Sequence, residues 1–124
     1  MSELLKKTAL ELADLLAAGE ITSVELTQAC LDRIHALNPK LNAFLFVDDD
    51  GALATARDID ARRAAGETLP RLAGVPIAIK DNMVSRGKPT TCASKILEGW
   101  LPPYDATVVG KLNANPILWT LAVA

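Results

Sequence analysis

The sequence is poor in the residues from which metal centres, disulfide frameworks and nucleic-acid surfaces are built. Its 124 residues include one His, two Cys, two Phe, two Trp and one Tyr, and 13 basic side chains stand against 15 acidic ones. Cys30 and Cys92 lie in no CxxC or His-rich pattern, so neither a zinc site nor a redox pair is supported. A net charge of −2 lacks the basic excess that drives binding to a phosphate backbone. We therefore expect no metal, no autonomous nucleic-acid binding, and reduced cysteines with Cys30 in the core.

The sequence also lacks a long hydrophobic segment. No apolar run approaches the ~18 residues of a membrane span. Glu3, Lys6 and Lys7 interrupt the amino-terminal segment where a secretory leader would need its apolar centre. Half of all residues are nevertheless hydrophobic, which is far from the composition of disordered chains. The composition therefore predicts a folded, cytoplasmic protein of one domain's length.

Charge is unevenly distributed along the chain. Residues 1–60 carry 11 acidic and 5 basic side chains, a net charge of −6, whereas residues 61–124 carry 4 acidic and 8 basic ones, a net charge of +4. The basic excess is scattered rather than clustered, so it does not indicate a nucleic-acid site. Beyond Asp105 only Lys111 is charged, and the sequence ends in the apolar run 117–124. Because a self-contained domain seldom ends this way, we expect the sheet to be incomplete.

Two capping boxes mark the starts of two amino-terminal helices. Thr8 with Glu11 precedes one apolar stripe, and Thr22 with Glu25 precedes another. The second stripe consists of Leu26, Cys30, Ile34 and Leu37. Pro39 is expected to end this helix because proline cannot continue the hydrogen-bond ladder. The two helices are expected to pack as a hairpin.

A strand, a helix and a second strand are predicted next. Residues 41–47 are rich in Leu, Phe and Val and predict a strand, and a helix is predicted from there to about Ala65. Gly74 then introduces VPIAI at 75–79, an uninterrupted apolar run that is typical of a strand buried on both faces. Helices that alternate with strands indicate an α/β fold.

Two polar features invite a metal-site interpretation that the pattern does not support. Asp48, Asp49 and Asp50 stand where the third helix begins, but a calcium loop needs further oxygen ligands at alternating positions. The three carboxylates are therefore predicted to cap the helix and face solvent. His35 lies one residue off its helix's apolar stripe, which predicts a surface position.

The junction at Lys80-Asp81-Asn82, directly after the second strand, is the most informative place in the sequence. Sites in open α/β sheets gather beyond the carboxyl ends of the strands. A lysine at the edge of an apolar strand is partly desolvated, which disfavours its charged form and suits it to activate a serine. The alternative is that Lys80 merely ends a strand in solvent.

The residues that follow, 83–94, are dense in hydroxyls, small residues and turn formers, and predict a loop. Ser85 and Ser94 are the only serines after Ser23, so they are the only local candidates for a nucleophile paired with Lys80. Their spacing favours neither. The alternative is a packed loop whose hydroxyls satisfy backbone groups.

Three blocks, in this order and spacing, resemble the amidase signature family. They are GVPIAIKDN at 74–82, TTCASKIL at 90–97 and PPYDATVV at 102–109. The second block is most similar to the A subunits of tRNA-dependent amidotransferases, and the resemblance covers residues 8–112. It implies the amino-terminal portion of an α/β amide hydrolase fold, with a helical hairpin followed by a mixed sheet and flanking helices.

The resemblance implies a Ser–cis-Ser–Lys site, in which a lysine at the end of this strand acts through a bridging serine on the nucleophilic serine. Lys80 matches that lysine and is the one catalytic residue that this chain is expected to supply. The A subunits release ammonia from glutamine and pass it to a B subunit, which activates misacylated tRNA with ATP and Mg²⁺. A C subunit holds the pair together. The B and C subunits are thus the implied partners, tRNA is reached only through them, and no cofactor is expected in this chain.

The sequence departs from the family where the two serines belong. Both lie in a Gly/Ser-rich segment well downstream of the lysine, and no serine follows Ser94. Residues 113–124 also diverge, because Trp119 and Thr120 stand where the family has Gly-Lys. Residues 1–112 are therefore expected to form the amino-terminal portion of an amidase-signature domain. The tail is expected to be an alternative strand, or the product of a truncation or frame change.

The residues leave three functional hypotheses. The favoured one is an A-subunit region that keeps only Lys80 and is inactive alone, because a base without its nucleophile forms no acyl-enzyme. The second is a minimal Ser/Lys amide hydrolase that uses Ser94 or Ser85. The third is a non-catalytic module that binds B or C subunits, or a copy of itself through its apolar tail, at an uncovered sheet edge.

Overall fold

The computed structural model describes residues 3–114 and 118–123, which form an α/β fold. In chain order the elements are the 3₁₀ turn Leu4–Lys6, α1 (Ala9–Ala18), α2 (Ser23–Leu41), β1 (Phe44–Val47), α3 (Asp49–Ala64), β2 (Pro76–Lys80), the 3₁₀ turn Lys95–Leu97, α4 (Thr107–Ala114) and β3 (Leu118–Val123). Within these residues, no helix combines the length and the apolar character that a membrane crossing requires.

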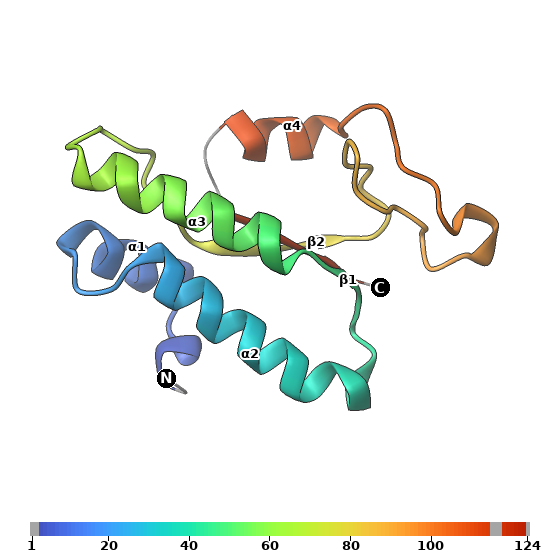
Figure 1. The fold of residues 1–124 in the computed structure, drawn as a ribbon, viewed down its shortest axis with the longest axis horizontal. Coiled ribbons are helices and arrows are strands. Elements are labelled where there is room, and N and C mark those ends of the chain that lie inside the picture. The colour runs from blue at the N-terminus through green and yellow to red at the C-terminus, as the bar shows by residue number, and fades with distance from the viewer. Residues whose placement is uncertain (1–2, 115–117, 124) are drawn as a thin grey trace.

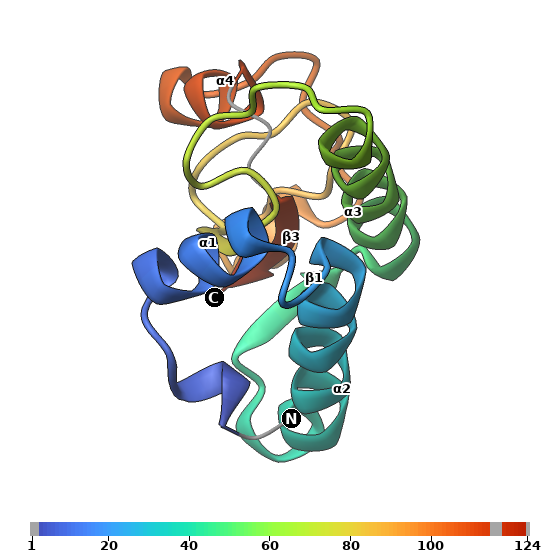
Figure 2. The same ribbon diagram turned by 90° about the vertical axis from the view of Figure 1, so that its left-hand side faces the viewer.

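The last strand in the sequence occupies the centre of the sheet. The strand order is β1-β3-β2, with β3 antiparallel to β1 and parallel to β2. Phe44 stands opposite Val123, and Pro76 stands opposite Leu118. Helices α2 and α3 run side by side in Figure 1, and in Figure 2 both lie on one side of the sheet. Residues 118–123 of the divergent tail therefore form a strand, as one of the interpretations of the sequence expected, whereas Asn113 and Ala114 belong to α4.

Both predicted capping boxes are present. The Thr8 hydroxyl accepts a hydrogen bond from Glu11 N (3.3 Å), and the Glu11 carboxylate accepts one from Thr8 N (2.7 Å). The same reciprocal pair joins Thr22 and Glu25, at 3.1 and 2.8 Å. The bond from the Thr8 backbone stabilises the charged carboxylate and lowers the pKa of Glu11. Short-range sequence patterns thus fix the starts of α1 and α2.

The prediction that Pro39 ends the second helix is wrong. Helix α2 includes Pro39 and continues to Leu41, because a proline in the last turn removes only one hydrogen bond from the ladder. Asn42 ends the helix in the left-handed conformation (φ 51°), with its N–H donating to Asn38 O at 2.8 Å. The following strand therefore begins at Phe44 rather than at Leu41.

The prediction of a strand buried on both faces is also wrong for β2. The strand lies at an edge of the sheet, since β3 is its neighbour on one side and the described residues place no strand on the other. Ile79 is buried, but Ala78 and Lys80 are exposed. Because alternate residues of a strand point to opposite faces, the face that carries Ala78 and Lys80 is open and the face that carries Ile79 is covered. An apolar run alone cannot tell whether both faces of a strand are covered, because the covering elements lie elsewhere in the sequence.

The buried core consists of two clusters. Leu12, Ala13 and Leu16 of α1 pack with Leu26 of α2 and with Val75, which leads into β2. This confirms the predicted packing of the two amino-terminal helices. Ala56 and Ile59 of α3 pack with Ala73 in the second cluster. Cys30 is half-buried and packs against the first cluster, so it contacts the core but lies at its margin.

Helix α2, helix α3 and the segment before β2 meet at Gly74. Asp60 of α3 accepts hydrogen bonds from the first backbone amides of α2, Ser23 N at 2.8 Å and Val24 N at 3.0 Å. Gly74 has a φ of +92° and lies so close to Ser23 that a Cβ there would overlap the Ser23 hydroxyl. That hydroxyl is buried and has no hydrogen-bond partner in the described part of the chain. The contact is therefore steric, and it requires glycine for two independent reasons.

We expect Gly74→Ala to destabilise the fold more than Gly66→Ala does. Gly66 also has a positive φ (+77°), but nothing lies within 4 Å of a Cβ built there. Gly66→Ala should therefore lower the free energy of unfolding by about 1–2 kcal/mol, through backbone strain alone. Gly74→Ala should lower the free energy of unfolding by the same strain and by a further ~1–3 kcal/mol, because the new Cβ overlaps Ser23. Urea unfolding measures both decreases in stability. Ser23→Ala, combined with Gly74→Ala, should recover part of the stability lost through the overlap. Equal losses at the two glycines would contradict this account.

The two cysteines should react at different rates. Burial raises the pKa of the Cys30 thiol, so less of it is thiolate at pH 8, whereas the Cys92 side chain is exposed. We expect a chromogenic disulfide reagent to modify Cys92 roughly tenfold faster or more. Cys92→Ser isolates Cys30 and Cys30→Ser isolates Cys92. The Cys30 rate should rise more steeply between pH 8 and 10, and similar rates for both variants at pH 8 would argue against the burial of Cys30.

Candidate active site

The candidate site lies where β2 ends, at Lys80 and Asp81. The two neighbours have opposite environments, since Lys80 is exposed and Asp81 is buried, with 4 % of its surface accessible. The expectation that Lys80 is partly desolvated is therefore wrong for the described residues, because Lys80 lies with Ala78 on the exposed face of β2. The Lys80 ammonium group is left accessible at the carboxyl end of the strand.

Hydrogen bonds to Asp81 hold the loop 91–93 against the end of β2. Its carboxylate accepts hydrogen bonds from the Thr91 hydroxyl (2.5 Å), from Thr91 N (3.2 Å to each oxygen) and from Ala93 N (3.3 Å). Its backbone carbonyl accepts another from Cys92 N at 3.0 Å. Cys92 and Ala93 adopt left-handed conformations, with φ of 51° and 56°. One buried residue thus holds three consecutive backbone amides in a tight loop beside Lys80.

The two serines that were candidates for a nucleophile have other partners. Ser85 is buried and its hydroxyl donates to Met83 O at 3.2 Å. The Ser94 hydroxyl accepts from Ile96 N at 3.3 Å and caps the short turn Lys95–Leu97. Among the described residues, no hydrogen bond joins either serine to Lys80. These contacts favour the interpretation in which the loop hydroxyls satisfy backbone groups.

The space between Lys80 and Ser85 is too small for an amide substrate. Both residues line a cavity of about 10 Å³, which is no larger than a single water molecule requires. The alternative of a minimal Ser/Lys hydrolase therefore has no substrate pocket at Ser85 in this arrangement.

A larger polar cavity adjoins the start of α3, and the sequence patterns did not indicate it. It has a volume of about 350 Å³ and is lined by Asp48, Gly51, Thr55, Arg86, Lys88, Asp105 and Asn113. Lys88 forms an ion pair with Asp48, and Asp105 accepts a hydrogen bond from Arg86 N at 2.7 Å. One basic and one acidic side chain are thus paired at the cavity, and a backbone amide holds the second carboxylate. These pairs join positions 40 and 19 residues apart, so local spacing carries no signal for them.

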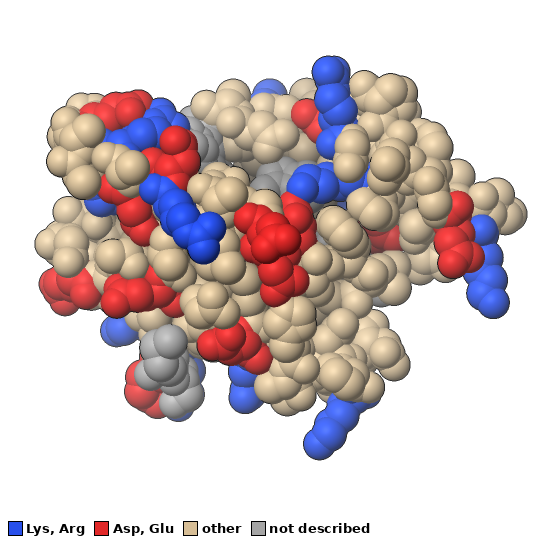
Figure 3. Space-filling view, in the orientation of Figure 1, with Lys and Arg blue, Asp and Glu red and all other residues tan. Residues whose placement is uncertain are grey.

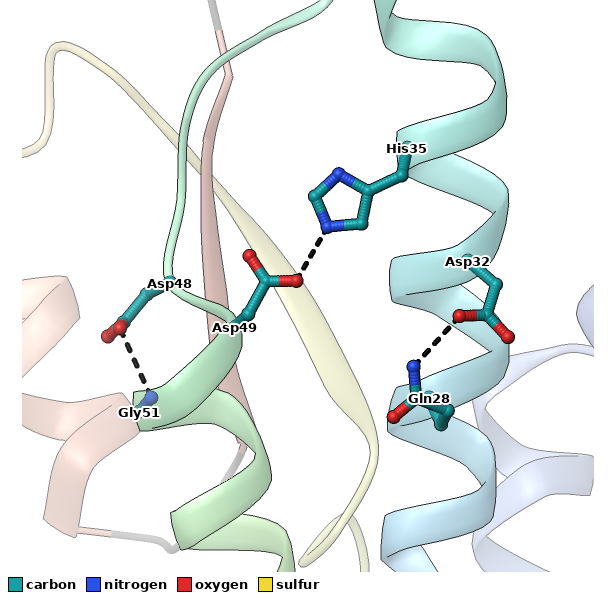
Figure 4. Close-up of polar contacts among 6 residues, drawn as sticks. All are labelled: Gln28, Asp32, His35, Asp48, Asp49 and Gly51. Atoms are coloured by element: carbon teal, nitrogen blue, oxygen red, sulfur yellow. Dashed lines mark hydrogen bonds and ion pairs between the residues drawn. The ribbon is translucent and has the colours of Figure 1, made fainter.

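Asp48 caps α3 as predicted for the aspartate cluster, but its side chain is only 18 % exposed and pairs with Lys88 rather than facing solvent. Asp48 caps α3 by accepting from Gly51 N at 3.2 Å, while Asp49 contacts His35 Nε2 at 2.5 Å (Figure 4). His35 is on the surface, as predicted, but its link from α2 to the start of α3 was not foreseen. The described residues contain no group of three or more His, Cys, Asp or Glu that could hold a metal ion.

Basic side chains are dispersed over the surface that Figure 3 shows. Lys and Arg alternate there with acidic and uncharged residues and form no continuous basic patch. Arg62 pairs with Glu67 and Arg71 pairs with Asp14.

Comparison with known proteins gives a consistent family match. The family model described as Amidase matches residues 25–119. The A subunit of glutamyl-tRNA(Gln) amidotransferase from Acidothermus cellulolyticus is 62% identical over 113 residues, which are 91% of this chain and 22% of the relative. The corresponding protein of Renibacterium salmoninarum is 58% identical over 120 residues, 95% of this chain and 23% of the relative. The chain thus spans less than a quarter of the curated relatives that it matches.

Solved structures agree at the level of the fold. Native peptide amidase from Stenotrophomonas maltophilia has a TM-score of 0.87 and 32% identity, over 94% of this chain and 24% of that one. Fatty acid amide hydrolase has a TM-score of 0.89 over 98% of this chain and 22% of that one. Its sequence is 24% identical, so this similarity shows a shared fold only. These similarities confirm the α/β amide-hydrolase architecture expected from the three sequence blocks.

We expect removal of the Asp81 carboxylate to release the loop 91–93. Asp81→Ala leaves the Thr91 amide without an acceptor and leaves the Ala93 amide only its bond to the Thr91 hydroxyl (3.2 Å), and the loss of a partner for such a group costs about 1–3 kcal/mol. Hydrogen exchange at these two amides should accelerate in Asp81→Ala and less in Asp81→Asn, which keeps one acceptor. Thr91→Val is the matched control, because it removes the hydroxyl's bonds to Asp81 and from Ala93 N but keeps both bonds from backbone amides to the Asp81 carboxylate. Unchanged exchange in Asp81→Ala would show that the loop is held by other contacts.

Proposed function

Because the chain belongs to the amidase family, we propose that it corresponds to the amino-terminal region of the A subunit of a glutamyl-tRNA(Gln) amidotransferase. The observation that carries the proposal is the 62% identity with the Acidothermus cellulolyticus protein over 91% of this chain. Lys80 at the end of β2 supports it, because this is the place in an open α/β sheet where catalytic groups gather.

In this proposal Lys80 is the base of a Ser–cis-Ser–Lys site. The Lys80 amine takes a proton from a bridging serine, which in turn takes the proton of the nucleophilic serine as that serine attacks the amide carbonyl. The proton then passes to the leaving ammonia, and water releases the acyl group. The exposed Lys80 side chain and the loop that Asp81 holds beside it support this role, because they leave Lys80 accessible to groups outside the described residues.

The proposal includes inactivity of this chain by itself. No serine follows Ser94 in the sequence, and the described contacts of Ser85 and Ser94 are to backbone groups. Loss of the nucleophile in a serine hydrolase lowers the rate by a factor on the order of 10⁶. Lys80 alone is therefore expected to give no measurable turnover.

The same proposal assigns to the complete enzyme, of which this chain would be one region, the activity of a tRNA-dependent amidotransferase. Glutamine would be the amide donor, and the ammonia would pass to a B subunit that activates Glu-tRNA(Gln) or Asp-tRNA(Asn), with a C subunit holding the two together. ATP and Mg²⁺ would bind the B subunit, and tRNA would be reached only through these partners. Such a reaction belongs to protein biosynthesis in the cytoplasm. The similarity to the A subunits supports this assignment as a family relation.

Ammonia release from glutamine by the purified chain tests the proposal. We expect the wild-type chain and Lys80→Ala to release ammonia at the same background rate, because the nucleophile that Lys80 would serve is not in this sequence. A wild-type rate about ten times that of Lys80→Ala would contradict inactivity. In that event Ser94→Ala and Ser85→Ala identify the nucleophile, since only one of them should abolish turnover.

A further inference from the structure

The polar cavity beside the start of α3 has the size of a small-molecule site and is separate from Lys80. Its volume of about 350 Å³ falls within the range of about 300–1,000 Å³ that is typical of ligand pockets. Its lining is drawn from three parts of the chain, which are residues 48–55 at the start of α3, residues 86–88 in the loop after β2, and residues 105–113 in and before α4. Lys80 and Asp81 are not among the lining residues.

The charged groups of this cavity balance, and both signs are present. Arg86 and Lys88 are positive, and Asp48 and Asp105 are negative. A ligand with a single charge meets two like charges in this lining, and like charges placed close together lower affinity. A ligand that carries one positive and one negative group can place each of them beside an opposite charge. The charge pattern therefore favours a zwitterion.

The Asp105 carboxylate is held in place and can still accept a further hydrogen bond. It accepts from Arg86 N at 2.7 Å and from Asn113 Nδ2 at 3.3 Å, one bond to each oxygen. A carboxylate has about four acceptor positions, so these two bonds leave room for another donor. Asp48, by contrast, already forms an ion pair with Lys88. Asp105 is therefore the preorganised acceptor for an ammonium group at this cavity.

The Arg86 guanidinium group is the matching donor for a carboxylate. The backbone amide of Arg86 is held by Asp105, whereas its side chain forms no hydrogen bond or ion pair with the residues that the structure describes. The guanidinium group carries five N–H donors in a planar fork that fits the two oxygens of a carboxylate. The bond between Arg86 N and Asp105 keeps these two residues together in one lining. An α-amino acid has the same two charged groups in the complementary order, joined by a single carbon.

We propose that this cavity binds a free α-amino acid with a short polar side chain. The Arg86 guanidinium group binds the carboxylate of the amino acid, and the Asp105 carboxylate binds its ammonium group. The hydroxyl of Thr55, another lining residue, donates to Gly51 O at 2.9 Å and keeps an acceptor position for a polar side chain of the ligand. The proposal does not depend on the proposed function, because it gives the cavity no part in the reaction at Lys80.

An NMR titration of the isotope-labelled 124-residue chain with four probes tests the proposal. L-glutamine and glycine carry both charges, acetate carries only the negative one, and methylammonium carries only the positive one. At pH 7 we expect glutamine and glycine to shift the amide signals of Gly51 and Arg86 in a saturable way. Acetate and methylammonium should bind at least about tenfold more weakly, because each lacks one of the two charge-assisted contacts.

Substitutions in the lining test whether the amino acid binds at this cavity. Arg86→Ala should weaken glycine binding at least about tenfold, because it removes the fork that holds the carboxylate. Arg57→Ala, at an exposed position of α3 outside the lining, is the matched control and should bind glycine like the wild type. Asp105→Asn keeps an oxygen for Arg86 N but removes the charge. It should weaken glycine binding by a similar factor, while acetate binds at least as tightly as it does to the wild type.

Any of three results would overturn the proposal. The first is no saturable shift with either amino acid up to its solubility limit. The second is binding of acetate or methylammonium as tight as that of glycine, which would indicate a site for a simple ion. The third is equal affinity of Arg86→Ala and Arg57→Ala for glycine, with circular dichroism showing that both are folded. The first two results need only the wild-type chain, so the test holds even if a variant fails to fold.

Discussion

The close contact between Gly74 and Ser23 is the constraint on which the rest of the arrangement depends. Asp60 fixes the start of α2 against α3, and Gly74 lets the segment before β2 approach that fixed point without steric overlap. Two helices and the entry to a strand are thereby joined at one place. Because β2 is only five residues long, its starting point also decides where Lys80 emerges.

The local elements of the fold could be predicted from the sequence, but their neighbours could not. Capping boxes, the aspartate cap of α3 and the apolar run of β2 are short-range signals, and the structure confirms each of them. The errors at Pro39 and at the faces of β2 have different physical origins. The consequence of a proline depends on how much of the helix follows it, and the burial of a strand depends on a neighbour elsewhere in the sequence.

The candidate site shows the same division between local and long-range information. Lys80 was identified by its place after an apolar strand and by the family resemblance. The role of Asp81 as an acceptor for the loop was not identified, because the donors to its carboxylate are 10 and 12 residues away and carry no periodic pattern. The ion pair of Lys88 with Asp48 and the contact of His35 with Asp49 likewise depend on how α2, α3 and the loop come together.

The central position of β3 determines the order in which this protein can fold. Strands β1 and β2 each pair with β3, so the sheet cannot assemble until a ribosome has delivered residues 118–123. The helices α1, α2 and α3 depend on nearer contacts and can form earlier during synthesis. A nascent chain would therefore carry β1 and β2 unpaired until β3 has emerged. During that interval unpaired strands invite aggregation, which makes the speed of the pairing step, rather than the final stability, the quantity that protects the protein in the cell.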